Sequence, residues 1–320
     1  NSNYTASPGG TTTIKLVDSL GASTLAVNDA DDVANNNWTI TNSHVTRTSP
    51  TPALTIDYSA QTTITNLSLA GGSAIETVNV NSTKVPTSGA GNAANDIFNV
   101  GNGDLDNLAG QVTIDGGDMD GPATRTVFSG GSVTGIVFTP GSGSEVSGDS
   151  LTVNDSQQPG VMKYGVTSTN VSRTAPAISV NYSKIEFLSL QAGKDESDVV
   201  INLPAVVDTL PAVVSIDGGN AAKDNRVKIV GTDADENITV GNATGVETNR
   251  SQFEVTSVTR LWVEGGKGAD KIHNRSSVPG LLDGGYAKST ASIDLGNQND
   301  VIASDAPSTT AFSPVLLGND

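Results

Sequence analysis

The feature that most constrains this chain is an internal repeat, in which segments of one half return in the same order in the other half. Leu25–Asp29 returns as Leu151–Asp155, and Ile56–Ser59 returns as Val180–Ser183. The remaining matches, in order, are Thr46–Thr48 with Ser172–Thr174, Leu67–Leu69 with Leu188–Leu190, and Ile114–Gly117 with Ile216–Gly219. We therefore expect two copies of one unit that keep their strands and differ in their loops.

Within each copy the sequence alternates apolar and polar residues over short runs, as in Leu67–Leu69, Val112–Ile114 and Val213–Ile216. Gly, Asn or Asp bounds these runs, which is the pattern of β-strands and tight turns. The longer apolar spacing of an amphipathic helix is missing. The pattern predicts an all-β protein.

Two all-β architectures fit this pattern. Short strands, turn residues at their ends and similar units recurring within each copy favour a right-handed parallel β-helix, or β-solenoid. Tandem β-sandwich domains remain the alternative.

The repeat also predicts a division of the chain. We expect an N-terminal segment at 1–24, a first β-repeat unit at 25–150, a second at 151–262, and C-terminal rungs resembling a calcium-binding roll at 263–320. The chain starts at Asn1 without a basic and apolar leader, and it stops within a turn-like sequence. We expect it to belong to a longer protein that continues beyond residue 320.

The charge balance excludes several partners. The chain has 34 acidic and 17 basic residues and a formal net charge of −17, which argues against nucleic acid and anionic lipid. It has 8 Glu, so 26 of its acidic residues are Asp, a residue that favours turns. No apolar run is long enough for a transmembrane helix, and the absence of Cys excludes disulfides and thiolate sites.

The sharpest local motif is Gly265–His273, which fits the pattern G-G-x-G-x-D-x-φ-x, where φ is apolar. Its glycines can turn backbone carbonyl oxygens inward, and Asp270 adds a carboxylate. Ca²⁺ takes about 6–8 oxygen ligands, so neighbouring turns would have to share each ion. Partial copies of the motif recur in other turns, and the alternative for each is an ordinary tight turn. The candidate calcium ligands are Gly265, Gly268, Asp270, Asp115, Asp118, Asp120, Asp217, Asp233, Asp235, Asp283, Asn297 and Asp300.

Two resemblances accompany these motifs. Gly265–His273 resembles the repeats-in-toxin nonapeptide, which implies a Ca²⁺-loaded β-roll in a secreted bacterial protein, with Gly265, Gly268 and Asp270 as ligands. The sequence departs from that family in lacking well-formed tandem copies. The region from about Leu25 to Ile302 is similar to repeats of very large bacterial surface and extracellular proteins, which implies a structural or adhesive role.

These observations predict a calcium-stabilised building block of a bacterial extracellular assembly, such as a surface layer, sheath or fibre, that associates with itself. An adhesin or carbohydrate-binding module is the second hypothesis. A β-helical polysaccharide lyase or epimerase is the third, and its candidate residues are Arg47, Arg173, Tyr58 and Tyr182. These four occupy equivalent positions in the two copies, whereas a catalytic residue is usually unique. We therefore expect them to be structural and the protein not to be an enzyme.

Overall fold

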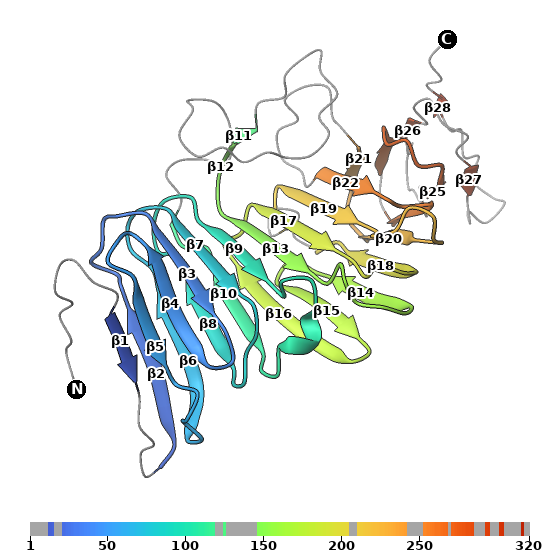
Figure 1. The fold of residues 1–320 in the computed structure, drawn as a ribbon. Coiled ribbons are helices and arrows are strands. Elements are labelled where there is room, and N and C mark those ends of the chain that lie inside the picture. Colours follow the sequence, from blue (N-terminus) through green and yellow to red (C-terminus); the bar gives the residue numbers. More distant parts are fainter. Residues whose placement is uncertain are drawn as a thin grey trace.

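The computed structural model describes residues 12–15, 21–118, 124–125, 146–204, 210–241, 252–267, 270–284, 292–294, 301–303 and 315–316. Its strands form two large mixed sheets, which we call sheet A and sheet B (Figure 1). The all-β prediction is confirmed, and the described residues contain only one short helix, the 3₁₀ turn η1 (Leu105–Asn107). None of their helices could span a membrane.

Sheet A has 14 strands. In spatial order they are β1 (Thr12–Lys15), β5 (Leu54–Asp57), β4 (His44–Ser49), β3 (Asn36–Ile40), β7 (Glu76–Val80), β9 (Ile97–Val100), β13 (Ser150–Asn154), β17 (Phe187–Gln191), β19 (Val213–Asp217), β22 (Gln252–Thr256), β21 (Asn237–Val240), β24 (Lys271–Asn274), β26 (Ser292–Asp294) and β28 (Val315–Leu316).

Sheet B has 12 strands. In spatial order they are β2 (Ser23–Asn28), β6 (Ile64–Ala70), β8 (Thr87–Ala90), β10 (Val112–Asp115), β16 (Ala177–Ser183), β15 (Asn170–Thr174), β14 (Met162–Val166), β18 (Ser197–Asn202), β20 (Arg226–Thr232), β23 (Arg260–Gly266), β25 (Gly280–Asp283) and β27 (Val301–Ala303). A separate antiparallel pair joins β11 (Thr124–Arg125) to β12 (Val146–Ser147).

Most strand pairs are parallel, because the chain passes back and forth between the two sheets. From β6 to β10 consecutive strands alternate between sheet B and sheet A, and β6, β7 and β8 each pair in parallel with the strand two positions later. Within the two sheets, the described antiparallel pairs belong to the segments β3–β4–β5 and β14–β15–β16.

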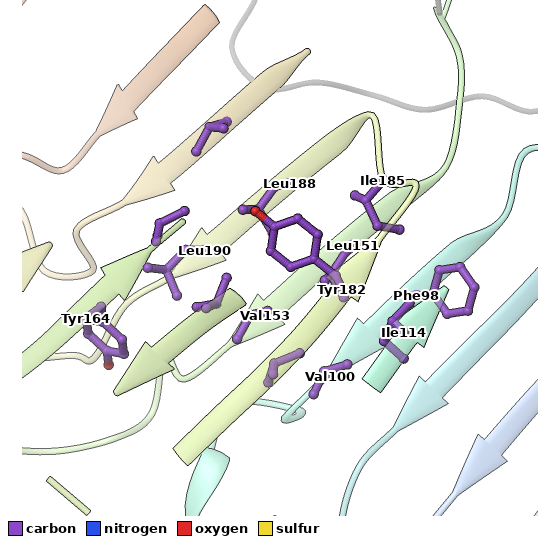
Figure 2. Close-up of a cluster of buried hydrophobic side chains, with 14 of the residues drawn as sticks. Phe98, Val100, Ile114, Leu151, Val153, Tyr164, Tyr182, Ile185, Leu188 and Leu190 are labelled. Atoms are coloured by element: carbon purple, nitrogen blue, oxygen red, sulfur yellow. The ribbon is translucent and has the colours of Figure 1, made fainter. Parts of the chain in front are cut away.

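The core lies between the two sheets. Parallel register places Phe98 beside Leu151 and Leu151 beside Leu188 along sheet A. Ile114 and Tyr182, which are register partners in sheet B, belong to the same buried cluster (Figure 2). Buried and less buried residues alternate along these strands, as the period-2 pattern predicts.

The structure makes the internal repeat visible in its hydrogen bonds. The Tyr58 hydroxyl donates to the Thr41 carbonyl, and the Tyr182 hydroxyl donates to the carbonyl of Thr167, at the equivalent position. The equivalent three-stranded segments nevertheless lie in opposite sheets: β3–β4–β5 in sheet A and β14–β15–β16 in sheet B. In the first copy, successive passes of the chain alternate between the two sheets, and the three-stranded segment counts as one pass. The first copy makes an odd number of passes, so the second copy begins in the other sheet.

Both sheets run without interruption through the two copies. In sheet A, β9 of the first copy pairs with β13 of the second, and in sheet B, β10 pairs with β16. The predicted boundaries at 24/25, 150/151 and 262/263 all fall within strands, namely β2, β13 and β23. They remain predictions about the units of the sequence.

Candidate functional site

The turn that carries the calcium motif belongs to a set of four similar turns. In each, a glycine at the end of a sheet B strand is followed five residues later by an acidic residue at the start of a sheet A strand. The four pairs are Gly71 with Glu76, Gly91 with Asp96, Gly231 with Glu236, and Gly265 with Asp270. The motif at Gly265 is therefore one instance of a recurring connection.

Acidic side chains from successive turns lie in a row beside sheet A. The Glu76 N–H donates to Asp96 Oδ1 at 2.7 Å, and the Asp96 N–H donates to Asp149 Oδ1 at 2.6 Å. The Asp149 N–H donates to Glu186 Oε2 at 2.7 Å. We call Glu76, Asp96, Asp149 and Glu186 the acidic row. Each of its last three carboxyl groups gives a backbone N–H of the preceding turn the acceptor it needs.

The same arrangement recurs further along the chain. The Glu236 N–H donates to Asp270 Oδ1 at 2.9 Å. The Ser197 N–H donates to Asn225 Oδ1 at 3.0 Å, so an amide can replace the carboxyl group in this position. The immediate role of these side chains is therefore to join neighbouring turns.

The first three residues of the acidic row are deeply buried and incompletely hydrogen-bonded, whereas Glu186 is partly buried. Glu76, Asp96 and Asp149 are each 0% exposed. Glu76 Oε2, Asp96 Oδ2 and Asp149 Oδ2 have no hydrogen-bond partner in the described part of the chain. Because burying an uncompensated charge is costly, each of these oxygens favours a proton or a cation.

Glycines make room for these oxygens. A Cβ added to Gly91 would lie 1.8 Å from Asp96 Oδ2 and 2.4 Å from the Gly116 carbonyl oxygen. A Cβ added to Gly116 would lie 2.4 Å from Asp149 Oδ2 and 2.0 Å from the carbonyl oxygen of Lys184. At each of these turns a carboxyl oxygen and a carbonyl oxygen converge on the space that the glycine leaves open.

Burial shifts the acid–base behaviour of these groups. It raises the pKa of Asp96 to about 8; the Glu76 N–H opposes the shift, and the Glu76 and Asp149 charges add to it. Burial also raises the pKa of Asp149 to about 7, with the Glu186 and Asp115 charges adding and Lys184 opposing. The pKa values of Glu76 and Glu186 are raised, chiefly by burial.

The candidate ligand Asp270 shares these properties. Its side chain is buried, and its Oδ2 would lie 2.4 Å from a Cβ on Gly265. Burial raises the pKa of Asp270 to about 7. The hydrogen bond from the Glu236 N–H opposes this shift, and the negative charges of Glu236 and Asp235 add to it.

The other candidate ligands are spread over separate turns. Asp118 is 3.3 Å from Lys184 Nζ, Asp233 is 2.8 Å from Lys267 Nζ, and Asp217 accepts the Gly219 N–H at 3.0 Å. Asp115 ends β10, Asp283 ends β25, and Asp235 is exposed before β21. In the described ranges no three acidic or histidine side chains gather as a metal group. Gly268, Asp120, Asn297 and Asp300 lie outside the described residues.

Sequence reasoning missed the acidic row. For Glu76, Asp96 and Glu236 the available signal was the spacing of five residues from glycine to acid, which Gly265 and Asp270 share. No such spacing marks Asp149, because a long insertion separates it from Gly116, the glycine against which it packs.

The two repeated arginines are paired with turn carboxylates, as their repetition predicts. The buried Arg173 guanidinium donates from Nη1 to Asp155 at 3.0 and 2.8 Å, and Nη2 donates to Asp106. Asp155 also accepts the Tyr164 hydroxyl at 2.6 Å. Every oxygen of the buried Asp155 carboxylate therefore has a donor.

The first copy has a looser version of this cluster. Arg47 Nη1 lies 3.7 Å from Asp29 Oδ1 and 3.4 Å from Asp32 Oδ2, and Trp38 replaces the tyrosine. Asp29 Oδ2 and Arg47 Nε have no hydrogen-bond partner among the described residues. The two arginines therefore contribute unequally to stability.

Comparison of the sequence with protein-family models, curated proteins and solved structures finds no match. The function is therefore inferred from the residues of the chain and their geometry.

The unequal arginine clusters give a first prediction. Arg173→Ala leaves Asp155 buried without its cation and should lower the free energy of unfolding by about 3–5 kcal/mol. Arg47→Ala, at the equivalent but partly exposed position, should cost about 1 kcal/mol or less. Urea unfolding followed by circular dichroism measures both. Equal losses in the two variants would contradict the difference between the clusters.

The glycine that faces Asp96 gives a second prediction. Gly91→Ala forces a Cβ against the Gly116 carbonyl oxygen and should lower the free energy of unfolding by about 1–3 kcal/mol or more. Gly89→Ala is the matched control, because its Cβ would meet only side-chain atoms at 3.4 Å or more, an ordinary packing distance. Thermal unfolding of both variants tests this, and a control as unstable as Gly91→Ala would disprove it.

Proposed function

We propose that this chain is a right-handed parallel β-solenoid and that it serves as a structural building block of a bacterial extracellular assembly. The observation that carries the proposal is the parallel pairing of strands from successive passes of the chain, in two sheets that continue through both repeat copies. In a solenoid each winding contacts only its neighbours, so the fold extends by adding windings. Right-handed crossover is the strong preference for parallel strands.

The outer face of sheet A supports a structural role. Parallel register aligns Asn79, Asn99, Thr152, Ser189 and Ser215 in one outward column of small polar side chains. Asn99 Nδ2 donates to Asn79 Oδ1 at 3.0 Å, which continues the ladder through the side chains. A regular polar face of this kind suits lateral packing of identical subunits.

The ends of the sheets provide a second means of association. β1 and β2 are the first strands of sheets A and B in spatial order, so among the described strands each pairs on one side only. An edge strand offers backbone N–H and C=O groups to another chain. Stacking of subunits end to end through such edges would produce a fibre, and lateral packing would produce a layer or sheath.

Calcium is proposed as the stabilising ion, on the basis of the net charge of −17 and the Gly265–Ile272 motif. The donor types at this turn fit the ion. Asp270 Oδ2 is buried with no partner among the described residues, and the nearby Asp233 and Asp235 are exposed carboxylates. Oxygen ligands of this kind are those that Ca²⁺ takes in proteins.

A glycan-binding or adhesive role is the second candidate, and one residue favours it. The Trp262 side chain on β23 is 41% exposed, and Lys228 Nζ lies 4.1 Å from the centroid of its ring. Exposed aromatic rings are common platforms for sugars. The polysaccharide lyase hypothesis needs Arg47 or Arg173 as a catalytic base. Both guanidinium groups instead form ion pairs with turn carboxylates.

The main test is negative-stain electron microscopy of the purified chain in millimolar calcium and then in excess chelator. We expect ordered sheets or fibres that dissolve when calcium is removed, because the acidic turns then repel one another. A sodium chloride sample of equal ionic strength controls for charge screening. Assemblies that survive chelation would support the structural role and contradict the stabilising role of calcium. Dispersed particles in both conditions would reject the structural proposal.

The glycan hypothesis has its own test. If the chain is an adhesin, it should bind a defined glycan on an array, and Trp262→Ala should abolish that binding without changing the unfolding temperature. Val33→Ala is the matched control, because Val33 is another exposed apolar residue, far from β23 in the sequence. Absence of binding by the wild-type chain would reject this role.

A further inference from the structure

The pair Glu76 and Asp96, at adjacent turns beside sheet A, consists of two fully buried carboxyl groups in direct succession. We propose that these two groups share one proton in the folded protein, so that the pair carries a single negative charge and its turns are stabilised by acid and weakened by alkali. The inference is independent of the proposed extracellular function.

The hydrogen bonds of the pair leave two oxygens to be satisfied. Asp96 Oδ1 accepts the Glu76 N–H at 2.7 Å, and Glu76 Oε1 accepts from Asn36 Nδ2 at 3.3 Å. Glu76 Oε2 and Asp96 Oδ2 remain without a donor among the described residues. A shared proton is the smallest group that would act as a donor to these oxygens. Two neighbouring carboxyl groups also repel each other when both are ionised, which favours keeping one proton.

A carbonyl acceptor is also close by. Asp96 Oδ2 and the Gly116 carbonyl oxygen lie 1.8 and 2.4 Å from the same point, the position that a Cβ on Gly91 would occupy. Two acceptors that face each other repel unless a proton or cation lies between them. Protonated Asp96 can donate to Glu76 or to this carbonyl.

The charged groups around the pair favour the proton. Asp29 lies near Glu76, and Asp149 lies near Asp96, so the nearest charges are negative. No described lysine or arginine forms an ion pair with Glu76 or Asp96. The groups facing the pair from the packed elements are Asp29 after β2, Asn36 in β3, Gly72 after β6 and Asp149 before β13, with Asp115, Lys184 and Glu186 facing Asp149 in turn.

A metal ion is the alternative to a proton at these two turns. The Asn92 side-chain amide donates to the Gly71 carbonyl, so that carbonyl is already engaged. Ser73 Oγ donates to the Asp32 carbonyl, and Asn95 Oδ1 is a further buried oxygen with no partner among the described residues. In the described ranges no third acidic or histidine side chain joins the pair as a metal group. The turn at Asp270 differs, because Asp233 and Asp235 accompany it.

The sign of the pH dependence follows from the direction of the shift. Burial raises the pKa of Asp96 to about 8 and also raises that of Glu76, whereas unfolded carboxyl groups titrate near about 4. The folded chain therefore holds a proton that the unfolded chain releases. The stability that this proton contributes is present below about pH 4 and is lost as the pH rises through about 8.

The test compares thermal unfolding of the wild-type chain and Asp96→Asn at about pH 5 and about pH 9, with chelator present throughout. The substituted amide keeps an oxygen for the Glu76 N–H and places an NH₂ where the proton would be. We expect the variant to unfold several degrees above wild type at pH 9 and to lose this advantage at pH 5. Asp31→Asn, which removes one exposed charge, should change little between the two pH values.

Infrared spectroscopy in D₂O observes the proton directly. Wild type at neutral pH should show the C=O stretching band of a protonated carboxyl group, and Asp96→Asn should show a weaker band. Glu76→Gln is the second variant if Asp96→Asn fails to fold. Absence of a protonated carboxyl band in wild type would overturn the inference. A second series at pH 9, with calcium in place of chelator, tests the alternative. The inference would also be overturned if calcium removed the difference between the two proteins.

Discussion

Parallel, in-register pairing places chemically similar side chains directly beside one another along both sheets, and the rest of the structure depends on this constraint. Each strand presents its residues in the same order as its neighbours, so a position becomes a column. Columns of apolar residues, such as Phe98, Leu151 and Leu188, bury one another at no electrostatic cost. The amides of Asn37, Asn79 and Asn99 hydrogen-bond to one another along sheet A.

Charged residues cannot form such a column without compensation. The acidic row places Glu76, Asp96, Asp149 and Glu186 at equivalent positions of successive turns, and the first three are fully buried. Backbone N–H groups satisfy one oxygen of the last three carboxyl groups. The remaining oxygens must be matched by protons or cations, which links the stability of the turns to the composition of the solution.

The two repeat copies show how equivalent residues can form ion-pair clusters with contacts of different length and burial. Arg173 and Asp155 form a buried cluster that η1 of the first copy helps to complete, through Asp106. Arg47 and Asp29 occupy the same positions with longer contacts. A repeat in which one copy completes the cluster of the next is suited to extension. This agrees with the proposed role as a building block, in which regular surfaces rather than a cleft carry the function.

The sequence by itself determined that the chain is all-β and that its segments repeat in order, and it predicted that the repeated arginines pair with turn carboxylates. These features depend on local alternation and on turn residues such as those around Gly265, which can be read without knowing which strands pair. Only the tertiary structure decided that equivalent segments of the two copies lie in opposite sheets and that Glu76, Asp96, Asp149 and Glu186 form one row. The physical reason is that parallel pairing joins residues tens of positions apart, across loops whose lengths differ between turns, and no local pattern records that distance.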